Sequence, residues 1–170
     1  VTSSDTGEAT VTSSLTFTSA NWDTPQNVTV TGVDDDLVDG TVNSTVTIAV
    51  DDANSDDDFD AVADQAVTAS TTDDDVAGFT VTETEGSTGV TEAGSTDILN
   101  VVLNSQPDSD VVLTISSSDT GESSVHGSTV SNNTITFTSA NWDTPQAFTV
   151  TGVDDDVVDG PVTSTVTISV

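Results

Sequence analysis

The sequence has no lysine, no arginine and only one histidine, so almost nothing in it neutralises its 30 acidic residues and the formal net charge is −30. Nucleic acids and acidic lipids bind mainly through basic side chains, which makes them disfavoured partners. No apolar run approaches the ~20 residues of a membrane-spanning helix. We therefore expect no nucleic-acid partner and no membrane insertion.

Cysteine is also absent, and aromatic residues make up only 4% of the 170 residues. With 33% hydrophobic residues, the chain can build only thin cores, and its length allows one large or two small domains. No disulfide can stabilise such domains, so a metal ion or a neighbouring domain would have to do so. A single large enzyme is disfavoured.

The residues that are abundant favour strands over helices. Threonine, serine and valine dominate the chain, and 25 of the 30 acids are aspartate, which is a poor helix former. Low aromatic content with high net charge is also typical of disorder. We favour the folded interpretation, because the apolar residues alternate with threonine instead of being scattered.

An internal repeat defines the organisation. Residues 17–50 and 137–170 match at 28 of 34 positions with an offset of 120, and the segment SSDTGE occurs at 3–8 and again at 117–122. The six-residue difference in offset indicates an insertion around His126. A repeat of about 115 to 120 residues is typical of a small sandwich domain and too long for a solenoid.

Period-two alternation between turn-forming residues predicts seven strands, A to G, per repeat. We expect an all-β fold of tandem immunoglobulin-like antiparallel sandwiches. Residues 1–76 form the first repeat, which lacks its N-terminal strands, and residues 77–170 form the second, which lacks its C-terminal strand. The predicted strands of the second repeat are 79–82, 97–103, 111–116, 134–137, 147–153 and 163–170; the first repeats the last four and adds 66–71.

Acidic loops follow alternate strands, and alternate strands of an antiparallel sandwich end at the same pole. Acids that are distant in the sequence should therefore converge there. The assigned residues are Asp5, Asp34, Asp35, Asp36, Asp39, Asp73, Asp74 and Asp75 in the first repeat, and Glu92, Asp119, Asp154, Asp155, Asp156 and Asp159 in the second.

Clustered carboxylates repel one another unless a cation lies among them. Calcium fits best, because it takes about 6 to 8 oxygen ligands in flexible geometry, whereas zinc favours histidine or cysteine and magnesium keeps its waters. The alternative is that the acidic loops are only a solvated surface. A solvated surface or a weaker ion site is preferred for Asp56, Asp57, Asp58 and Asp60, which lie in a long loop without a predicted partner.

Four motifs together resemble the Calx-beta domain, a calcium-binding sandwich of the sodium/calcium exchanger and of many bacterial surface proteins. They are Glu92 within VTEAG, the Asp-Gly segment after strand C, the GVDDD-x-x-DG loop, and TTDDDVAG at 71–78. The run FTSANWDTPQ-x-x-TVTGVDDD is similar to the Calx-beta-like repeats of giant secreted bacterial adhesins. The resemblance covers nearly the whole chain.

The resemblance implies calcium ligands at matching positions. The family pattern has glutamate where this chain has Asp39 and Asp159, and the shorter side chain reduces reach. The implied ligands are Glu92, Asp5, Asp119, Asp34, Asp35, Asp154, Asp155, Asp39, Asp159, Asp73, Asp74 and Asp75.

Other features carry less weight. His126 has no catalytic context and is interpreted as a surface-loop residue. Trp22 and Trp142 occupy identical Asn-Trp-Asp-Thr-Pro turns, for which a packing anchor is favoured over a sugar-stacking platform. No catalytic constellation is visible, so we expect no enzyme.

The resulting expectation is a structural extender repeat of a secreted or cell-surface bacterial protein, such as an adhesin, fibre or surface coat. Because Asp73 to Asp75 directly precede Phe79, calcium there would stiffen the junction to the next repeat. The expected partners are neighbouring repeats of the same chain or identical subunits. Two alternatives remain: a filament subunit completed by neighbouring strands, and a calcium-sensing binding module.

Overall fold

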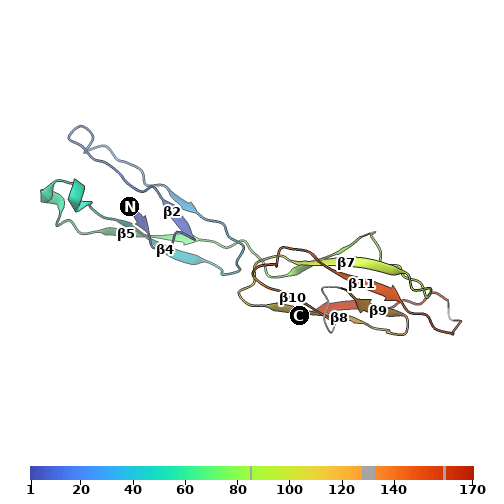
Figure 1. The fold of residues 1–170 in the computed structure, drawn as a ribbon. Coiled ribbons are helices and arrows are strands. Elements are labelled where there is room, and N and C mark those ends of the chain that lie inside the picture. The colour runs from blue at the N-terminus through green and yellow to red at the C-terminus, as the bar shows by residue number, and fades with distance from the viewer. Residues whose placement is uncertain (85, 128–132, 159) are drawn as a thin grey trace. The chain divides into compact units, whose positions relative to one another are not determined.

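A computed structural model describes residues 1–84, 86–127, 133–158 and 160–170. The chain is all-β with antiparallel sheets, and it forms two compact units, Val1–Asp74 (unit 1) and Asp75–Val170 (unit 2) (Figure 1). The sequence placed this division between residues 76 and 77. The only helical elements in the described segments are the 3₁₀ turns Asp52–Asn54 and Asp57–Phe59, and none of them is long and apolar enough to cross a membrane.

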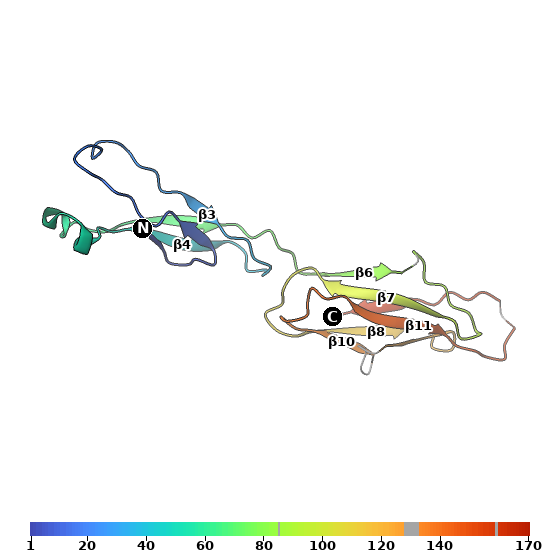
Figure 2. The same cartoon turned by 45° about the horizontal axis from the view of Figure 1, so that its top comes forward.

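Unit 2 contains two antiparallel sheets that share one core (Figure 2). One has the order β6-β7-β11-β9, with β6 at Phe79–Glu83, β7 at Thr96–Leu103, β11 at Gln146–Gly152 and β9 at Ser123–His126. The other has the order β10-β8-β12, with β10 at Thr134–Phe137, β8 at Val111–Ser117 and β12 at Val166–Ser169.

The core of unit 2 follows from strand alternation. Every second residue of a strand faces the same side, so Leu99, Val101 and Leu103 of β7 are buried together. The facing sheet contributes Leu113 and Ile115 of β8 with Phe137 of β10. Each fully buried side chain of this size stabilises the fold by about 1.5–3 kcal/mol. Two sheets with a shared apolar core make unit 2 a β-sandwich.

Unit 1 has the same kind of sheets with fewer strands. A three-stranded sheet has the order β1-β4-β5, and a two-stranded sheet pairs β2 with β3. Its buried hydrophobic residues in the described segments are Ala9 and Val46. Its strands are β1 at Thr2–Ser3, β2 at Ala9–Val11, β3 at Val30–Gly32, β4 at Val42–Ile48 and β5 at Gln65–Thr71.

Similar sequence takes different structure in the two units. Residues 134–137 form β10 and Phe137 is fully buried, whereas residues 14–17 form no strand and Phe17 is 53% exposed. The strand predicted at 14–17 was therefore wrong. β10 pairs with residues 111–114 of β8, and the counterparts of those residues, 114 positions earlier, fall outside the 170 residues.

The two tryptophans differ in the same way. Trp142 packs against the core of unit 2 and its carbonyl accepts a hydrogen bond from the Leu103 N–H at 3.1 Å, as a packing anchor should. Trp22 is 71% exposed, because unit 1 has no counterpart of β7 beneath it. The packing interpretation therefore holds for unit 2 only.

Two strands were missed by the sequence analysis. β9 and its counterpart β2 are short and rich in serine, threonine or alanine, so neither shows a long alternating pattern. His126 ends β9 instead of lying in a loop, and its Nε2 atom lies 2.7 Å from Thr151 Oγ1. The prediction that His126 is exposed at the surface was correct.

A buried serine network is complete in unit 2 and broken in unit 1. Ser123 Oγ lies 2.8 Å from Ser117 Oγ and 2.7 Å from Ser164 Oγ. The repeat offsets place Ala9 and Ser44 at the positions of Ser123 and Ser164. Ser44 Oγ is buried and has no hydrogen-bond partner among the described residues, because alanine replaces the serine that would bond to it.

Replacing Ala9 with serine should therefore stabilise unit 1. The new hydroxyl would give Ser44 the partner that Ser164 already has, and a net gain of about 0.5–1.5 kcal/mol is expected. Hydrogen exchange of β2 and β4 amides measures it. Thr10→Ser changes an exposed neighbour and serves as control; an Ala9→Ser variant no more protected than this control would contradict the account.

Candidate metal centre

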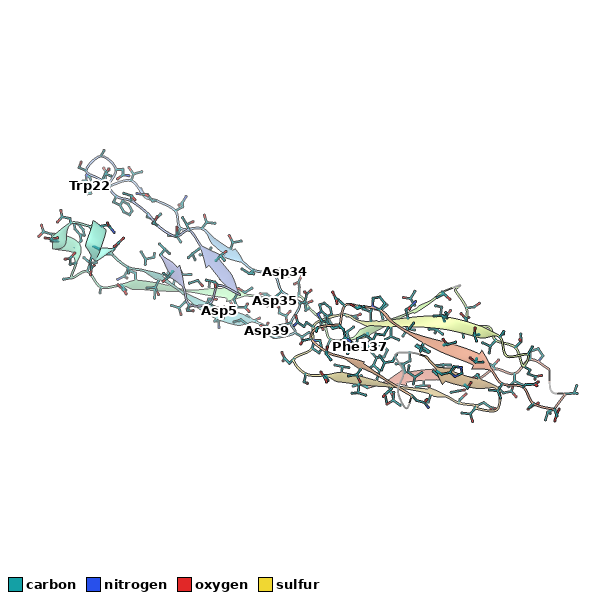
Figure 3. All side chains as sticks on the ribbon, viewed as in Figure 1. Asp5, Trp22, Asp34, Asp35, Asp39 and Phe137 are labelled. Atoms are coloured by element: carbon teal, nitrogen blue, oxygen red, sulfur yellow. The ribbon has the colours of Figure 1, made fainter. Side chains whose placement is uncertain are left out.

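Three carboxylates from two segments of unit 1 converge. One carboxylate oxygen each from Glu8, Asp35 and Asp39 lies within 4.8 Å of the other two. Glu8 directly precedes β2, Asp35 follows β3, and Asp39 precedes β4. Figure 3 shows Asp5, Asp34, Asp35 and Asp39 at one end of unit 1 and Trp22 at its other end. We call Glu8, Asp35 and Asp39 the acidic cluster.

The position of Glu8 is set by a tight turn within SSDTGE. Asp5 Oδ1 accepts a hydrogen bond from the Gly7 N–H at 3.0 Å, and the Asp5 carbonyl accepts one from Ser3 Oγ at 2.8 Å and one from the Ala9 N–H at 3.0 Å. Aspartate side chains commonly bond the backbone two residues on in this way. The Glu8 carbonyl then accepts from the Val33 N–H at 2.9 Å, which joins the turn to the acidic loop that follows β3.

The acidic loop is held by its own side chains and by Asp73. Asp35 Oδ1 accepts a hydrogen bond from the Leu37 N–H at 2.8 Å, and Gly40 adopts a left-handed φ of 77° directly after Asp39. The Gly40 N–H donates to Asp73 Oδ2 at 2.8 Å. Asp73 follows β5, so the segment that leaves unit 1 is bonded to the residue next to the cluster.

The cluster is electrostatically strained in the absence of a cation. Partial desolvation, together with the negative charges of Asp39, Asp35 and Asp5 and a hydrogen bond with Asp39, raises the pKa of Glu8 above its ordinary value of 4.5. Protonation of Glu8 therefore favours the folded state. This stabilising free energy is fully present at pH values below the ordinary pKa of Glu8. It is lost as the pH rises through the raised pKa of the folded state. At neutral pH the carboxylates repel, and a bound cation would remove that repulsion.

The donor set suits a hard cation. Oxygen ligands from carboxylates are what calcium and magnesium take, whereas zinc sites favour the histidine and cysteine that this cluster lacks. Exposure of Asp35 and Asp39 leaves room for water ligands. The geometry supports a metal site of this class without selecting one ion.

The sequence-predicted ligands of unit 1 divide into three groups. Asp35 and Asp39 are in the cluster, while Asp5 and Asp73 shape its surroundings. Among the described residues, Asp34, Asp36 and Asp74 are not part of it, and Asp75 belongs to unit 2. Glu8 was missed, although its position in the repeated SSDTGE was a usable signal.

Unit 2 repeats the supporting geometry. Asp119 Oδ1 accepts from the Gly121 N–H at 3.0 Å, Asp155 Oδ1 accepts from the Val157 N–H at 2.7 Å, and the Glu122 carbonyl accepts from the Val153 N–H at 2.9 Å. Asp159, the counterpart of Asp39, lies outside the described residues. Asp154 and Asp156 are exposed, and no cluster forms around them in the part that the structure describes.

Glu92 lies in the loop between β6 and β7. The Gly152 N–H donates to the Ser95 carbonyl at 3.0 Å, which holds this loop against the end of β11, just before the acidic residues 154–156. Glu92 belongs to no carboxylate cluster among the described residues.

No family model, curated protein sequence or solved structure matches the chain.

Proposed function

We propose that this chain is a non-catalytic, calcium-binding extender repeat of a secreted or cell-surface bacterial protein, such as an adhesin, fibre or surface coat. The observation that carries the proposal is the acidic cluster of Glu8, Asp35 and Asp39 in unit 1. The sequence resemblance to Calx-beta repeats supports calcium as the ion and a repeat array as the setting.

Calcium would act by joining segments that otherwise repel. The cluster gathers the turn before β2 and the loop between β3 and β4, and the Gly40–Asp73 hydrogen bond adds the segment after β5. A chain with no lysine or arginine has almost no cationic group of its own to neutralise these acids. An ion binding only the folded state stabilises it by mass action.

The position of Asp73 in the sequence supports the extender role. It stands at the end of unit 1, and an ion that orders the Asp39–Gly40 loop also orders the segment through which the chain continues. Less freedom in that segment limits how far one repeat swings relative to the next. Extracellular calcium modules typically have dissociation constants of about 10⁻⁴–10⁻³ M, which suits constitutive loading outside the cell.

Calcium is therefore expected to raise the melting temperature of unit 1. A free calcium concentration of about 100 times the dissociation constant stabilises the folded state by about 2.7 kcal/mol. The measurement is a thermal melt at fixed high sodium with calcium or magnesium added, and with hydrogen exchange reporting on unit 1. Asp39→Asn should abolish most of the shift.

The matched control for Asp39→Asn is Asp57→Asn, which removes the same charge from an exposed 3₁₀ turn. It should leave the calcium shift unchanged. If both variants reduce the shift equally, or if sodium alone stabilises as well as calcium, the acids act only as a solvated surface and the proposal fails.

A further inference from the structure

Equivalent strands of the two units pair in the same register, but the two units differ at one sheet edge. β1 pairs with β4 through Ser3↔Val46, and β8 pairs with β12 through Ser117↔Val166, which are equivalent pairs under the two repeat offsets. In unit 1 the other edge of β4 is occupied by β5 over seven residue pairs. Among the described residues, the same edge of β12 has no neighbouring strand.

The length of β12 reflects the open edge. β4 is a strand from Val42 to Ile48, whereas β12 begins only at Val166, so residues 162–165 are outside any strand although their counterparts 42–45 are inside one. Those counterparts are the residues that pair with 68–71 of β5. The sequence predicted a strand over 163–170, and the absence of a partner strand explains its late start.

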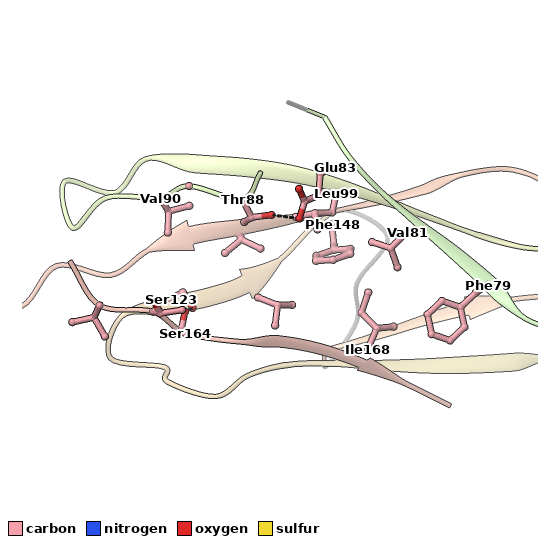
Figure 4. A pocket seen from close by; sticks show the side chains of 15 residues that line it. Phe79, Val81, Glu83, Thr88, Val90, Leu99, Ser123, Phe148, Ser164 and Ile168 are labelled. Atoms are coloured by element: carbon pink, nitrogen blue, oxygen red, sulfur yellow. Dashed lines mark hydrogen bonds between the residues drawn. The ribbon is translucent and has the colours of Figure 1, made fainter. Parts of the chain in front are cut away.

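A cavity of about 580 Å³ lies along this edge (Figure 4). Phe79 and Val81 of β6 line one wall, and Val166 and Ile168 of β12 line the other. Glu83 is the only acidic residue in the lining, and its Oε1 accepts a hydrogen bond from Thr88 Oγ1 at 3.2 Å. The cavity is therefore a groove lined by both apolar and polar side chains, and it lies beside an unpaired strand edge within unit 2.

We propose that this groove binds one extended strand of the β5 type, antiparallel to β12. Gln65–Thr71 supplies the chemistry of the occupant: seven uncharged residues in which Val67, Ala69 and Thr71 share one face. By the register of β4 with β5, Val67 of the occupant lies opposite Val166 and Ser70 opposite Thr163. An uncharged strand avoids the repulsion that an acidic one would meet on this chain.

The directions of the backbone N–H and C=O groups of β4 and β12 fit the proposal. The Thr45 and Thr165 carbonyls accept from Ser4 and Ser118 N–H groups at 2.9 Å, so the backbone groups of these residues face β1 and β8. Alternation along an antiparallel strand turns the groups of Val46 and Val166 to the other edge. In unit 1 that edge meets β5. In unit 2 it is available to an added strand, a known mode of peptide recognition.

Disulfide trapping in the full chain tests the register. The chain has no cysteine, so Thr163→Cys introduces a single thiol. The probe is a capped peptide of residues 63–72 carrying Ser70→Cys, opposite Thr163 at a non-hydrogen-bonded pair, where side chains lie closest. The reaction runs in a buffer of reduced and oxidised glutathione, in which oxidised glutathione takes up the two electrons and two protons as the mixed disulfide forms, and mass spectrometry follows that disulfide. We expect trapping about tenfold or more faster than with Val112→Cys, which is exposed on β8 outside the groove.

Two further arms make the result decisive. N-methylation of Val67 in the peptide removes the N–H that faces β12 and should slow trapping to the Val112→Cys rate. Equal rates at both cysteine positions, or with both peptides, would overturn the proposal. Faster formation of Thr163→Cys dimers than of peptide adducts would also overturn it, because the edge would then pair with a second copy of β12. None of these outcomes depends on calcium.

Discussion

Replacing Phe137 with alanine is expected to lower the free energy of unfolding of unit 2 by about 3–5 kcal/mol. The side chain is fully buried, and β10 places it in the shared core opposite the sheet that carries Leu99 and Phe148. Truncation leaves a cavity that well-packed neighbours fill only partly. Chemical denaturation, with amide exchange assigned to β8 and β10, measures the loss.

The matched variant is Phe17→Ala, within the identical sequence FTSANWDTPQ. Phe17 is 53% exposed, so its loss should cost less than about 1 kcal/mol. A large effect at Phe17 would mean that residues 14–17 pack in unit 1 as residues 134–137 do in unit 2, which would contradict the described difference between the repeats.

Gly152→Ala is expected to destabilise unit 2 by about 1–3 kcal/mol or more. A Cβ at this position would lie 2.1 Å from the Thr91 carbonyl oxygen and 2.7 Å from its carbon. Both atoms are backbone, so the loop that carries Glu92 must move away from β11. Denaturation measures the cost, and hydrogen exchange at Gly94 and Gly152, whose amides bond within or to this loop, measures the displacement.

Gly32→Ala is the equivalent change in unit 1 and should be nearly neutral. Its added Cβ would meet only Thr71 Cγ2 at 3.8 Å, an ordinary van der Waals distance. Comparable losses at both glycines would show that the requirement for glycine comes from the backbone of the repeat and not from the loop between β6 and β7.

Repetition made much of the fold predictable. The alternating segments of the second repeat gave six strands close to those observed, and the all-β antiparallel class followed from them. Burial was harder to predict, because identical segments differ only in their neighbours. Phe17 and Phe137 show this most clearly: the strand that covers one has no counterpart for the other within the chain.

The candidate site was predictable in its chemistry and only partly in its residues. Loops after alternate strands did converge, because the turn before β2 brings Glu8 to Asp35 and Asp39, which share the loop between β3 and β4. The predicted ligand of this turn was Asp5 and not Glu8, but the Asp5 side chain accepts a hydrogen bond from the Gly7 N–H and shapes the turn. Which carboxylate of a turn reaches the cluster depends on backbone geometry that sequence spacing alone does not specify.

The central claim is that the acidic cluster binds calcium, and calorimetric titration of calcium into the full chain tests it most directly. The account predicts saturable binding at high sodium that weakens about tenfold or more in Glu8→Gln and is unchanged in Asp57→Asn. Binding that is equally strong in the wild type, Glu8→Gln and Asp39→Asn, or no saturable binding in the wild type, would contradict it.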